Sequence, residues 1–531
     1  MAMTERPQVR AADGGKCWEH RFDRFYLKAY VPDNDLNGQV NNYGFRAPLL
    51  LVFEERPQSM ESAVIFARES GLKSIAARYD TAVLFVYPTS EGGWAGEDAG
   101  LYRSLIAEIK MIQTYRDGIV ENWDFFTRSF RGYFVRGAIF RADIYSFGAS
   151  ADYVAKNLLT TVEGEYLWGP GEITPAVCSM ERLSVVPDVR RRDIPVISVG
   201  NTAGIDKAFE GCEHLLIKGR ADYEADFDAF VKRFKMWCGR VEIEPDLKAL
   251  HMTEEPGYVM VKTSPDNVSA VKGTETHDVG YFAYYNDGLF SRGPVPLVIG
   301  FHGGGDSSMY LTFVAGWWDI ARRHDFLFVS VENHQFVTAA EAAEMIGELK
   351  KRYPVDPRRV YATGFSMGSG KTWDLYQQYP ELLAGVMPCS ALFPVRTTLF
   401  GEKVTGRINE DVPVPVFYSG GEESPLPELP SQGEGCVERV KYVAAVNGLT
   451  KDFGGLDFQD KENWEDRFMG IPGDRVEKIY DPTRDSTLTV RYYDSRDGVC
   501  RTAFAGVSGQ MHECRMHSCE NAWKFISRFS R

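Results

Sequence analysis

The sequence predicts an α/β protein made of tandem domains, each a mostly parallel β-sheet flanked by helices. Short β-branched or aromatic runs alternate with helix-compatible segments along the 531 residues. Several strand-like segments occur once in each half of the chain, as in a repeat. A Gly-x-Ser-x-Gly turn joins a strand-like run to a helix-compatible segment within residues 360–376. A chain of this length needs more than one hydrophobic core, which also favours two domains.

The Gly-x-Ser-x-Gly turn has Ser366 at its centre, between Gly364 and Gly368. The strand-like run 360–365 enters it, and the helix-compatible segment 371–376 leaves it. So sharp a turn crowds the backbone, and we expect both flanking positions to require glycine. A serine on a strand–turn–helix junction is typical of a nucleophile elbow, so Ser366 is the predicted nucleophile.

A second glycine-rich turn lies upstream of this serine. Residues 296–301 are predicted as a buried strand that leads directly into His302-Gly303-Gly304-Gly305. Such a turn can bring a backbone N–H to a developing oxyanion. We expect the N–H of Gly304 to be one donor, with Gly303 as its alternative, and the N–H of Met367 to be the other. His302 is expected to be structural.

The acid that orients the catalytic base is expected after the next predicted strand, residues 414–419. That strand ends at Gly420-Gly421-Glu422-Glu423, which offers two adjacent carboxylates. We expect Glu423 to be the acid, and Glu422 is the alternative.

The base is expected near the C-terminus, in a turn-like segment before a helix predicted at 521–526. Gly509-Gln510-Met511-His512 fits the loop placement of a catalytic histidine, so His512 is the predicted base, with His517 as the alternative. The order serine, acid, histidine is that of α/β-hydrolases.

The same region resembles a known esterase group. Arg352–Pro357 leading into Arg359–Gly368, Thr372–Leu375, Tyr379–Leu382 and Ala522–Phe525 are similar to a group that contains polyhydroxybutyrate depolymerase-like enzymes, feruloyl esterases and predicted peptidases. The resemblance covers roughly residues 275–531 and implies an α/β-hydrolase fold and ester hydrolysis through an acyl-enzyme. Two positions depart from the group: Ser369 stands where a glycine is usual, and Glu422 or Glu423 where an aspartate is usual.

The resemblance implies a small soluble ester as substrate, with a hydroxycinnamoyl, acetyl or hydroxyalkanoate acyl group. A serine peptidase or amidase of the same fold is the alternative enzyme. A non-catalytic binding or scaffold protein is the alternative from another class.

The first half of the chain looks like a degenerate copy of the second. Segment 48–53 matches 296–301, and segment 193–196 matches 411–414. Segment 144–152 matches 360–368, which pairs Ser150 with Ser366.

The copies differ where the chemistry is expected. The first half has Glu54-Glu55-Arg56-Pro57 in place of the glycine turn, so carboxylates replace an anion-binding loop. We therefore expect residues 1–245 to form a non-catalytic α/β-hydrolase-like domain and residues 246–531 to form the catalytic domain.

An irregular insertion, residues 451–484, is a candidate lid or substrate wall, or else packs on its own domain. Its large apolar residues are Phe453, Phe458, Trp464, Phe468 and Met469. Aromatic residues also follow the glycine turn, and any that faced the site would suit an aromatic acyl group: Tyr310, Phe313, Trp317 and Trp318.

Composition excludes several other classes. The net charge of −14 argues against a nucleic-acid surface, and no apolar window is long enough for a membrane span. Nine cysteines without a disulfide-scaffold spacing, and an N-terminus without an apolar signal segment, predict a cytoplasmic protein. The proposed chemistry needs no metal or organic cofactor. Assembly into a homo-oligomer stays open.

Overall fold

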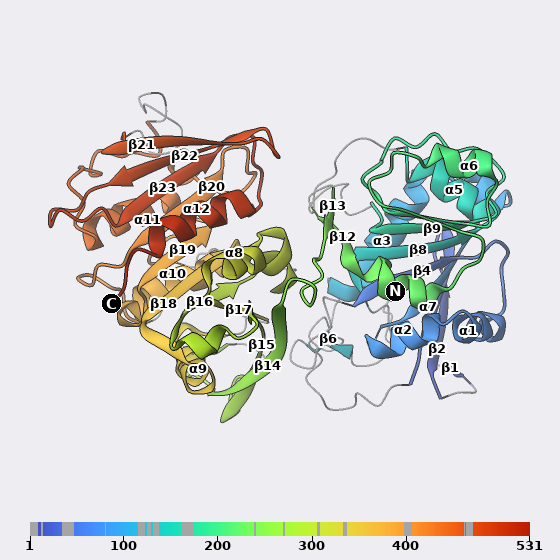
Figure 1. Cartoon of the computed structure of the whole chain (residues 1–531), viewed down its shortest axis with the longest axis horizontal. Helices are drawn as coiled ribbons and strands as arrows, with labels where there is room; N and C mark the ends of the chain where they lie inside the picture. The colour runs from blue at the N-terminus through green and yellow to red at the C-terminus, as the bar shows by residue number, and fades with distance from the viewer. Residues whose placement is uncertain are drawn as a thin grey trace. The chain divides into compact units, whose positions relative to one another are not determined.

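The computed structural model describes residues 9–11, 14–33, 47–79, 81–114, 123–124, 129–130, 137–160, 174–237, 240–268, 271–304, 308–332, 337–397, 406–460, 462 and 471–531. The chain divides into two compact units, Met1–Pro245 and Asp246–Arg531. Each unit contains one large sheet with helices on both faces (Figure 1).

The C-terminal unit contains a 10-stranded sheet whose central strands run parallel, from β17 through β23. Antiparallel strands close it at both edges. All seven residues of β16 are buried, as expected for a parallel strand covered on both faces. The strand order is β14 (Met252–Lys262), β15 (Thr276–Asn286), β17 (Leu327–Val331), β16 (Val295–Phe301), β18 (Val355–Phe365), β19 (Gly385–Cys389), β20 (Val416–Gly421), β23 (Thr502–Val507), β22 (Ser486–Tyr493), β21 (Arg475–Asp481).

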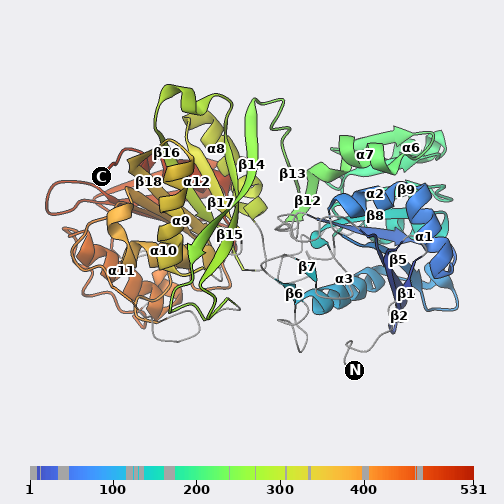
Figure 2. The same ribbon diagram turned by 90° about the horizontal axis from the view of Figure 1, so that it is seen from below.

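Helices cover both faces of this sheet (Figure 2). On one face the core includes side chains from α9 (Ala339–Arg352), α10 (Met367–Gln378) and α11 (Glu434–Val446). On the other face, Trp523 of α12 (Met516–Ile526) packs against Tyr361 of β18, and Trp317 of α8 (Trp317–His324) stacks on Phe328 of β17. The short helical segments are η5 (Leu289–Arg292), η6 (Tyr310–Val314), η8 (Pro380–Leu382) and η9 (Pro430–Gln432).

The N-terminal unit repeats this architecture. Its sheet runs β1 (Val9–Arg10), β2 (Lys16–Arg21), β3 (Phe25–Val31), β5 (Val83–Pro88), β4 (Pro48–Phe53), β8 (Ala138–Phe147), β9 (Val177–Glu181), β10 (Val196–Val199), β11 (Leu215–Lys218). Strands β2 to β11 have the same order and the same parallel or antiparallel pairings as β14 to β23 in the C-terminal unit. The predicted fold class, tandem α/β-hydrolase-like domains, is confirmed.

The helices of the N-terminal unit also form two layers. Side chains of α3 (Ala99–Thr114), α5 (Ala149–Asn157) and α6 (Ala203–Ala208) belong to the core of one face. Those of α1 (Met60–Glu69), α2 (Leu72–Arg78) and α7 (Tyr223–Ala229) belong to the core of the other. Smaller elements complete the unit: η2 (Gly93–Gly96), η4 (Val231–Arg233), the pair β6 (Trp123–Asp124) and β7 (Ser129–Phe130), and the pair β12 (Phe234–Trp237) and β13 (Arg240–Ile243).

The insertion at 451–484 packs on its own unit where it is described. Phe453 is 4% exposed and belongs to the core cluster, and Phe458 packs against that cluster. The insertion then forms the whole of edge strand β21. Trp464, Phe468 and Met469, which were part of the predicted lid or wall, lie outside the described residues.

A buried ion pair joins His277 of β15 to Glu341 in the first turn of α9. The Glu341 carboxylate lies 3.3 Å from His277 Nε2 and accepts hydrogen bonds from the N–H groups of Ser264 and Thr338, both 2.7 Å, and from the Asn267 amide. Burial alone would raise the pKa of Glu341, but these donors outweigh it and lower its pKa to about 2. For His277, the attraction of Glu341 outweighs burial and raises the pKa.

This pair predicts a pH-dependent contribution to stability. Because the pKa of His277 is raised in the folded state, its contribution to the free energy of unfolding is fully present below pH ~6.5. This contribution is lost as pH rises through the pKa of His277 in the folded protein. The lowered Glu341 pKa contributes above pH ~4.3 and is lost as pH falls toward about 2. His277→Gln should therefore lower the melting temperature most between these limits, near pH 5.5, and less at pH 8.5. An equal loss at both pH values, measured by calorimetry, would contradict this assignment.

Candidate active site

Ser366 occupies a strained turn at the start of α10. Its backbone has φ 53° and ψ −118°, a left-handed conformation that non-glycine residues seldom adopt. A Cβ at Gly364 would lie 2.1 Å from the carbonyl oxygen of Gly368, and a Cβ at Gly368 would lie 1.9 Å from that of Phe301. Both positions therefore require glycine, as the sequence predicted.

Three side chains form a hydrogen-bonded chain at this turn. Ser366 Oγ lies 2.8 Å from His512 Nε2, and His512 Nδ1 lies 2.5 Å from Glu428 Oε1. Because a carboxylate only accepts hydrogen bonds, Nδ1 carries the proton and Nε2 is left to accept from the serine hydroxyl. The imidazole also packs against the Phe365 ring, with centroids 4.9 Å apart.

The Glu428 carboxylate is fully buried and held by two further donors. The N–H of Gly421 donates to Oε2 and the hydroxyl of Ser424 donates to Oε1, each at 2.7 Å. Three donors thus fix the carboxylate toward the imidazole and offset the cost of burying its charge.

The structure places Glu428, rather than Glu423 or Glu422, at His512. Glu423 is exposed, and its backbone N–H donates to the carbonyl of Gln510; the N–H of Glu422 donates to that of Val507. These bonds hold the turn that follows β20 against Val507 and Gln510, so the carboxylate at His512 comes from farther along the loop. A weak signal for Glu428 exists in the sequence, because it alone of the three carboxylates directly precedes an apolar pair, the buried Leu429-Pro430.

The predicted histidine loop lies where a base is needed. His512 stands in the loop before α12, whereas His517, the alternative, belongs to the first turn of that helix. A Cβ at Gly421 would lie 2.3 Å from the carbonyl oxygens of Gln510 and Met511. Glycine at the end of β20 therefore lets this loop approach closely.

The glycine turn after β16 lies against the serine. A Cβ at Gly303 would lie 3.4 Å from Ser366 Cβ, and a Cβ at Gly304 would lie 2.4 Å from Met367 Sδ. His302 is buried, and its Nδ1 lies 2.7 Å from the carbonyl oxygen of Gly303. The peptide bond between Gly303 and Gly304 is trans, so its carbonyl and its N–H point in opposite directions. Because the carbonyl of Gly303 faces His302, the N–H of Gly304 points away from His302. Gly305 lies outside the described residues.

Two other predicted features are structural. Ser369, where the esterase group usually has glycine, is buried and donates its hydroxyl to the carbonyl of Ala391 at 2.9 Å. Tyr310 and Trp317 are fully buried and Phe313 is 9% exposed, so these aromatic residues belong to the core. Trp318 is half-buried.

The N-terminal unit has the same elbow without a nucleophile. Gly148, between β8 and α5, has φ 51° and ψ −117°, close to the values of Ser366. The pairing of Ser150 with Ser366 is wrong by two residues: 366 − 148 = 218, the same offset as 411 − 193 = 218 for the matched segment 193–196. Ser150 takes the place of Gly368, buried with its hydroxyl donating to the carbonyl of Phe53.

An ion pair covers this second elbow. A Cβ at Gly148 would lie 2.4 Å from Glu55 Oε1, and Glu55 Oε2 accepts a hydrogen bond from Arg182 at 2.9 Å. Glu54, the counterpart of His302, is buried with Lys28 at 2.6 Å. The elbow position thus has no hydroxyl, and a carboxylate occupies the space beside it.

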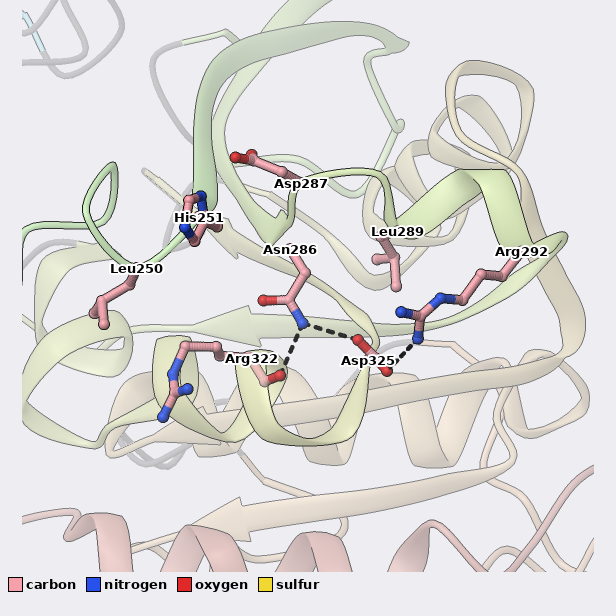
Figure 3. A pocket seen from close by; sticks show the side chains of 8 residues that line it. All are labelled: Leu250, His251, Asn286, Asp287, Leu289, Arg292, Arg322 and Asp325. Carbon is pink, nitrogen blue, oxygen red and sulfur yellow. Dashed lines mark hydrogen bonds and ion pairs between the residues drawn. The ribbon is translucent and has the colours of Figure 1, made fainter.

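A separate pocket of about 270 Å³ lies in the C-terminal unit and shares no residue with the Ser366 site. Figure 3 shows Asn286 and Arg292 converging on Asp325, each at 2.8 Å. The pocket is lined by two arginines, Arg292 and Arg322, and two aspartates, Asp287 and Asp325, so its formal charges cancel. Among the described residues, no three His, Cys, Asp or Glu side chains are grouped as metal ligands, and no helix is long and apolar enough to cross a membrane.

Comparison with known proteins supports the resemblance of this chain to the α/β-hydrolase esterase group. A bifunctional acetylxylan esterase/xylanase of Neocallimastix patriciarum is 27% identical over 245 residues, which are 44% of this chain and 31% of that protein. The chain thus matches less than a third of its relative. No family model matches the chain.

Solved structures with a related fold include an acetyl xylan esterase from Aspergillus awamori, at 13% identity and a TM-score of 0.34 over 51% of this chain and 99% of that one. A ferulic acid esterase superimposes at 12% identity and a TM-score of 0.27, over 37% and 88% of the two chains. At such TM-scores the superpositions are loose, and the fold assignment rests on the strand topology described above.

Proposed function

We propose that this protein is a serine carboxylic-ester hydrolase and that Ser366 forms the acyl-enzyme. The observation that carries the proposal is the Ser366–His512–Glu428 chain at a strained elbow, with hydrogen-bond distances of 2.8 and 2.5 Å. A serine hydroxyl becomes a competent nucleophile when an oriented imidazole accepts its proton. The acetylxylan esterase relative is consistent with this reaction class.

The geometry suggests the role of each group. His512 Nε2 takes the proton of Ser366 as Oγ attacks the ester carbonyl, and Glu428 stabilises the imidazolium that forms. The developing oxyanion is met by the N–H of Met367, at the start of α10, and by the N–H of Gly304, which points away from His302. His512 then protonates the leaving alkoxide, and a water activated by the same imidazole releases the acid.

For the substrate we propose an acetyl or similarly small acyl ester of a carbohydrate. The name of the relative supports this choice. The aromatic residues expected to favour a hydroxycinnamoyl group give it no support, because Tyr310, Phe313 and Trp317 are buried.

A matched substrate panel tests the proposal. We expect kcat/KM to be higher for acetylated xylo-oligosaccharides than for feruloylated ones. The panel also contains an aryl acetate and the acetanilide that matches it, and kcat/KM should be at least ~10²-fold lower for this amide than for the ester. Preference for the feruloyl ester would overturn the acyl assignment alone. A comparable rate on the amide would instead identify a peptidase or amidase.

We further propose that the N-terminal unit is non-catalytic, since a glycine stands at its elbow. Ser150→Ala should leave ester hydrolysis within about twofold of wild type and lower stability by about 1–2 kcal/mol, because the hydrogen bonds of its hydroxyl to the carbonyl of Phe53 and from the N–H of Phe147 are lost. Steady-state kinetics and chemical denaturation measure the two effects. Loss of activity in a folded Ser150→Ala protein would contradict the proposal.

A further inference from the structure

Two buried thiols lie in contact just beyond His512. The sulfur atoms of Cys514 and Cys519 are 3.3 Å apart, and the two residues are 1% and 4% exposed. Cys514 belongs to the loop that carries His512, and Cys519 belongs to α12. Neither thiol has a part in the proposed ester hydrolysis.

The backbones of both residues are anchored, so the contact between the sulfurs is defined by the fold. The N–H of Cys514 donates to the hydroxyl of Tyr310 at 2.6 Å, and the N–H of Cys519 donates to the carbonyl of Arg515 at 3.1 Å. The Tyr310 ring packs against Phe365, which in turn packs against His512. The position of Cys514 is therefore linked by direct contacts to the imidazole.

We infer that Cys514 and Cys519 form a disulfide under oxidising conditions and so clamp the His512 loop to α12. A disulfide needs a sulfur–sulfur distance of about 2.05 Å, so the two atoms must approach by about 1.3 Å. Rotation of the two side chains can supply a movement of this size while the backbone anchors stay in place. The bond would be a covalent modification beside the proposed catalytic base.

The reaction balances with a disulfide oxidant such as oxidised glutathione. The thiolate of one cysteine attacks the glutathione disulfide and releases one glutathione thiolate, and the second cysteine then attacks the mixed disulfide and releases the other. Two protein thiols lose two electrons and two protons, and one glutathione disulfide becomes two glutathione thiols.

The surroundings predict a slow reaction in the folded protein. Contacts with the thiols of Cys389 and Cys519, together with burial, raise the pKa of Cys514, so little reactive thiolate is present. We expect the bond to form as the chain folds or when the loop opens. The disulfide and its effect on stability are independent of the proposed esterase activity. Only the benefit of holding His512 in place for catalysis rests on that proposed function.

Peptide mapping tests the pairing directly, because Arg515 lies between the two cysteines. Trypsin cleaves after Arg501, Arg515 and Lys524, which separates Cys514 on peptide 502–515 from Cys519 on peptide 516–524. The protein is refolded with oxidised and reduced glutathione, or with dithiothreitol alone, then alkylated and digested without reduction. We expect the two peptides to be joined in the oxidised sample and separate after reduction.

Two other outcomes would overturn the inference. One is peptides 502–515 and 516–524 both alkylated in the oxidised sample. The other is peptide 502–515 joined to the peptide that carries Cys389, the third thiol near the contact. Cys519→Ala provides the matched control: wild type should melt a few degrees higher when oxidised, and the variant should show no such shift. An equal shift in both proteins would also contradict the clamp, while the peptide map stands even where the variant fails to fold.

Discussion

Ser366→Ala is expected to lower kcat for ester hydrolysis by about 10⁴-fold or more, because the nucleophile is removed while the rest of the site stays in place. Alanine fits the position, since Ser366 contributes only its hydroxyl to the hydrogen bond with His512. KM should change little if the substrate is bound mainly by other groups. Steady-state kinetics on the aryl acetate would measure both constants.

Ser369→Ala is the control for this substitution. Ser369 lies on the same helix, is buried, and donates to Ala391 rather than to His512. The Ser369→Ala substitution should lower the free energy of unfolding and leave kcat within a few-fold of wild type. A Ser366→Ala protein that keeps wild-type activity would contradict the assignment of the nucleophile.

Glu428→Gln is expected to lower kcat by about 10³–10⁴-fold. An amide of the same shape fills the site but carries no charge, so it stabilises neither the required tautomer of His512 nor the imidazolium. The variant should remain folded, because glutamine keeps an oxygen that can accept from Gly421 or Ser424. Circular dichroism and kinetics together check this expectation.

Glu423→Gln is the matched control, since it makes the same chemical change five residues earlier (428 − 423 = 5). Its side chain is exposed, so activity should stay within about twofold of wild type. The reverse result, a large loss in Glu423→Gln and none in Glu428→Gln, would favour the acid predicted from sequence over the one seen in the structure.

The elbow and its glycines could be predicted from sequence because their requirement is local. The close approach at Gly364 is to Gly368 within the same turn, so the spacing of the two glycines reveals it; the approach at Gly368 is to Phe301 of the adjacent strand β16, but the same short motif marks that position. The histidine was predictable for a similar reason, as it lies in a turn before a clear amphipathic helix.

The acid was not predictable in the same way. Its position depends on the course of the loop after β20, where the N–H of Glu422 bonds to Val507 of β23 and the N–H of Glu423 bonds to Gln510 in the His512 loop. That pairing is long-range and leaves no periodic pattern in the chain. In the N-terminal half, the residues alone favoured matching serine with serine, whereas the backbone angles match Gly148 with Ser366.

The most direct test of an activated Ser366 is intact mass after treatment with a fluorophosphonate, on wild type and on Ser366→Ala. The structure predicts one adduct on wild type and none on the variant, with Ser150 unmodified because its hydroxyl is buried against Phe53. No adduct on folded wild-type protein, or an adduct that persists in Ser366→Ala, would contradict the account.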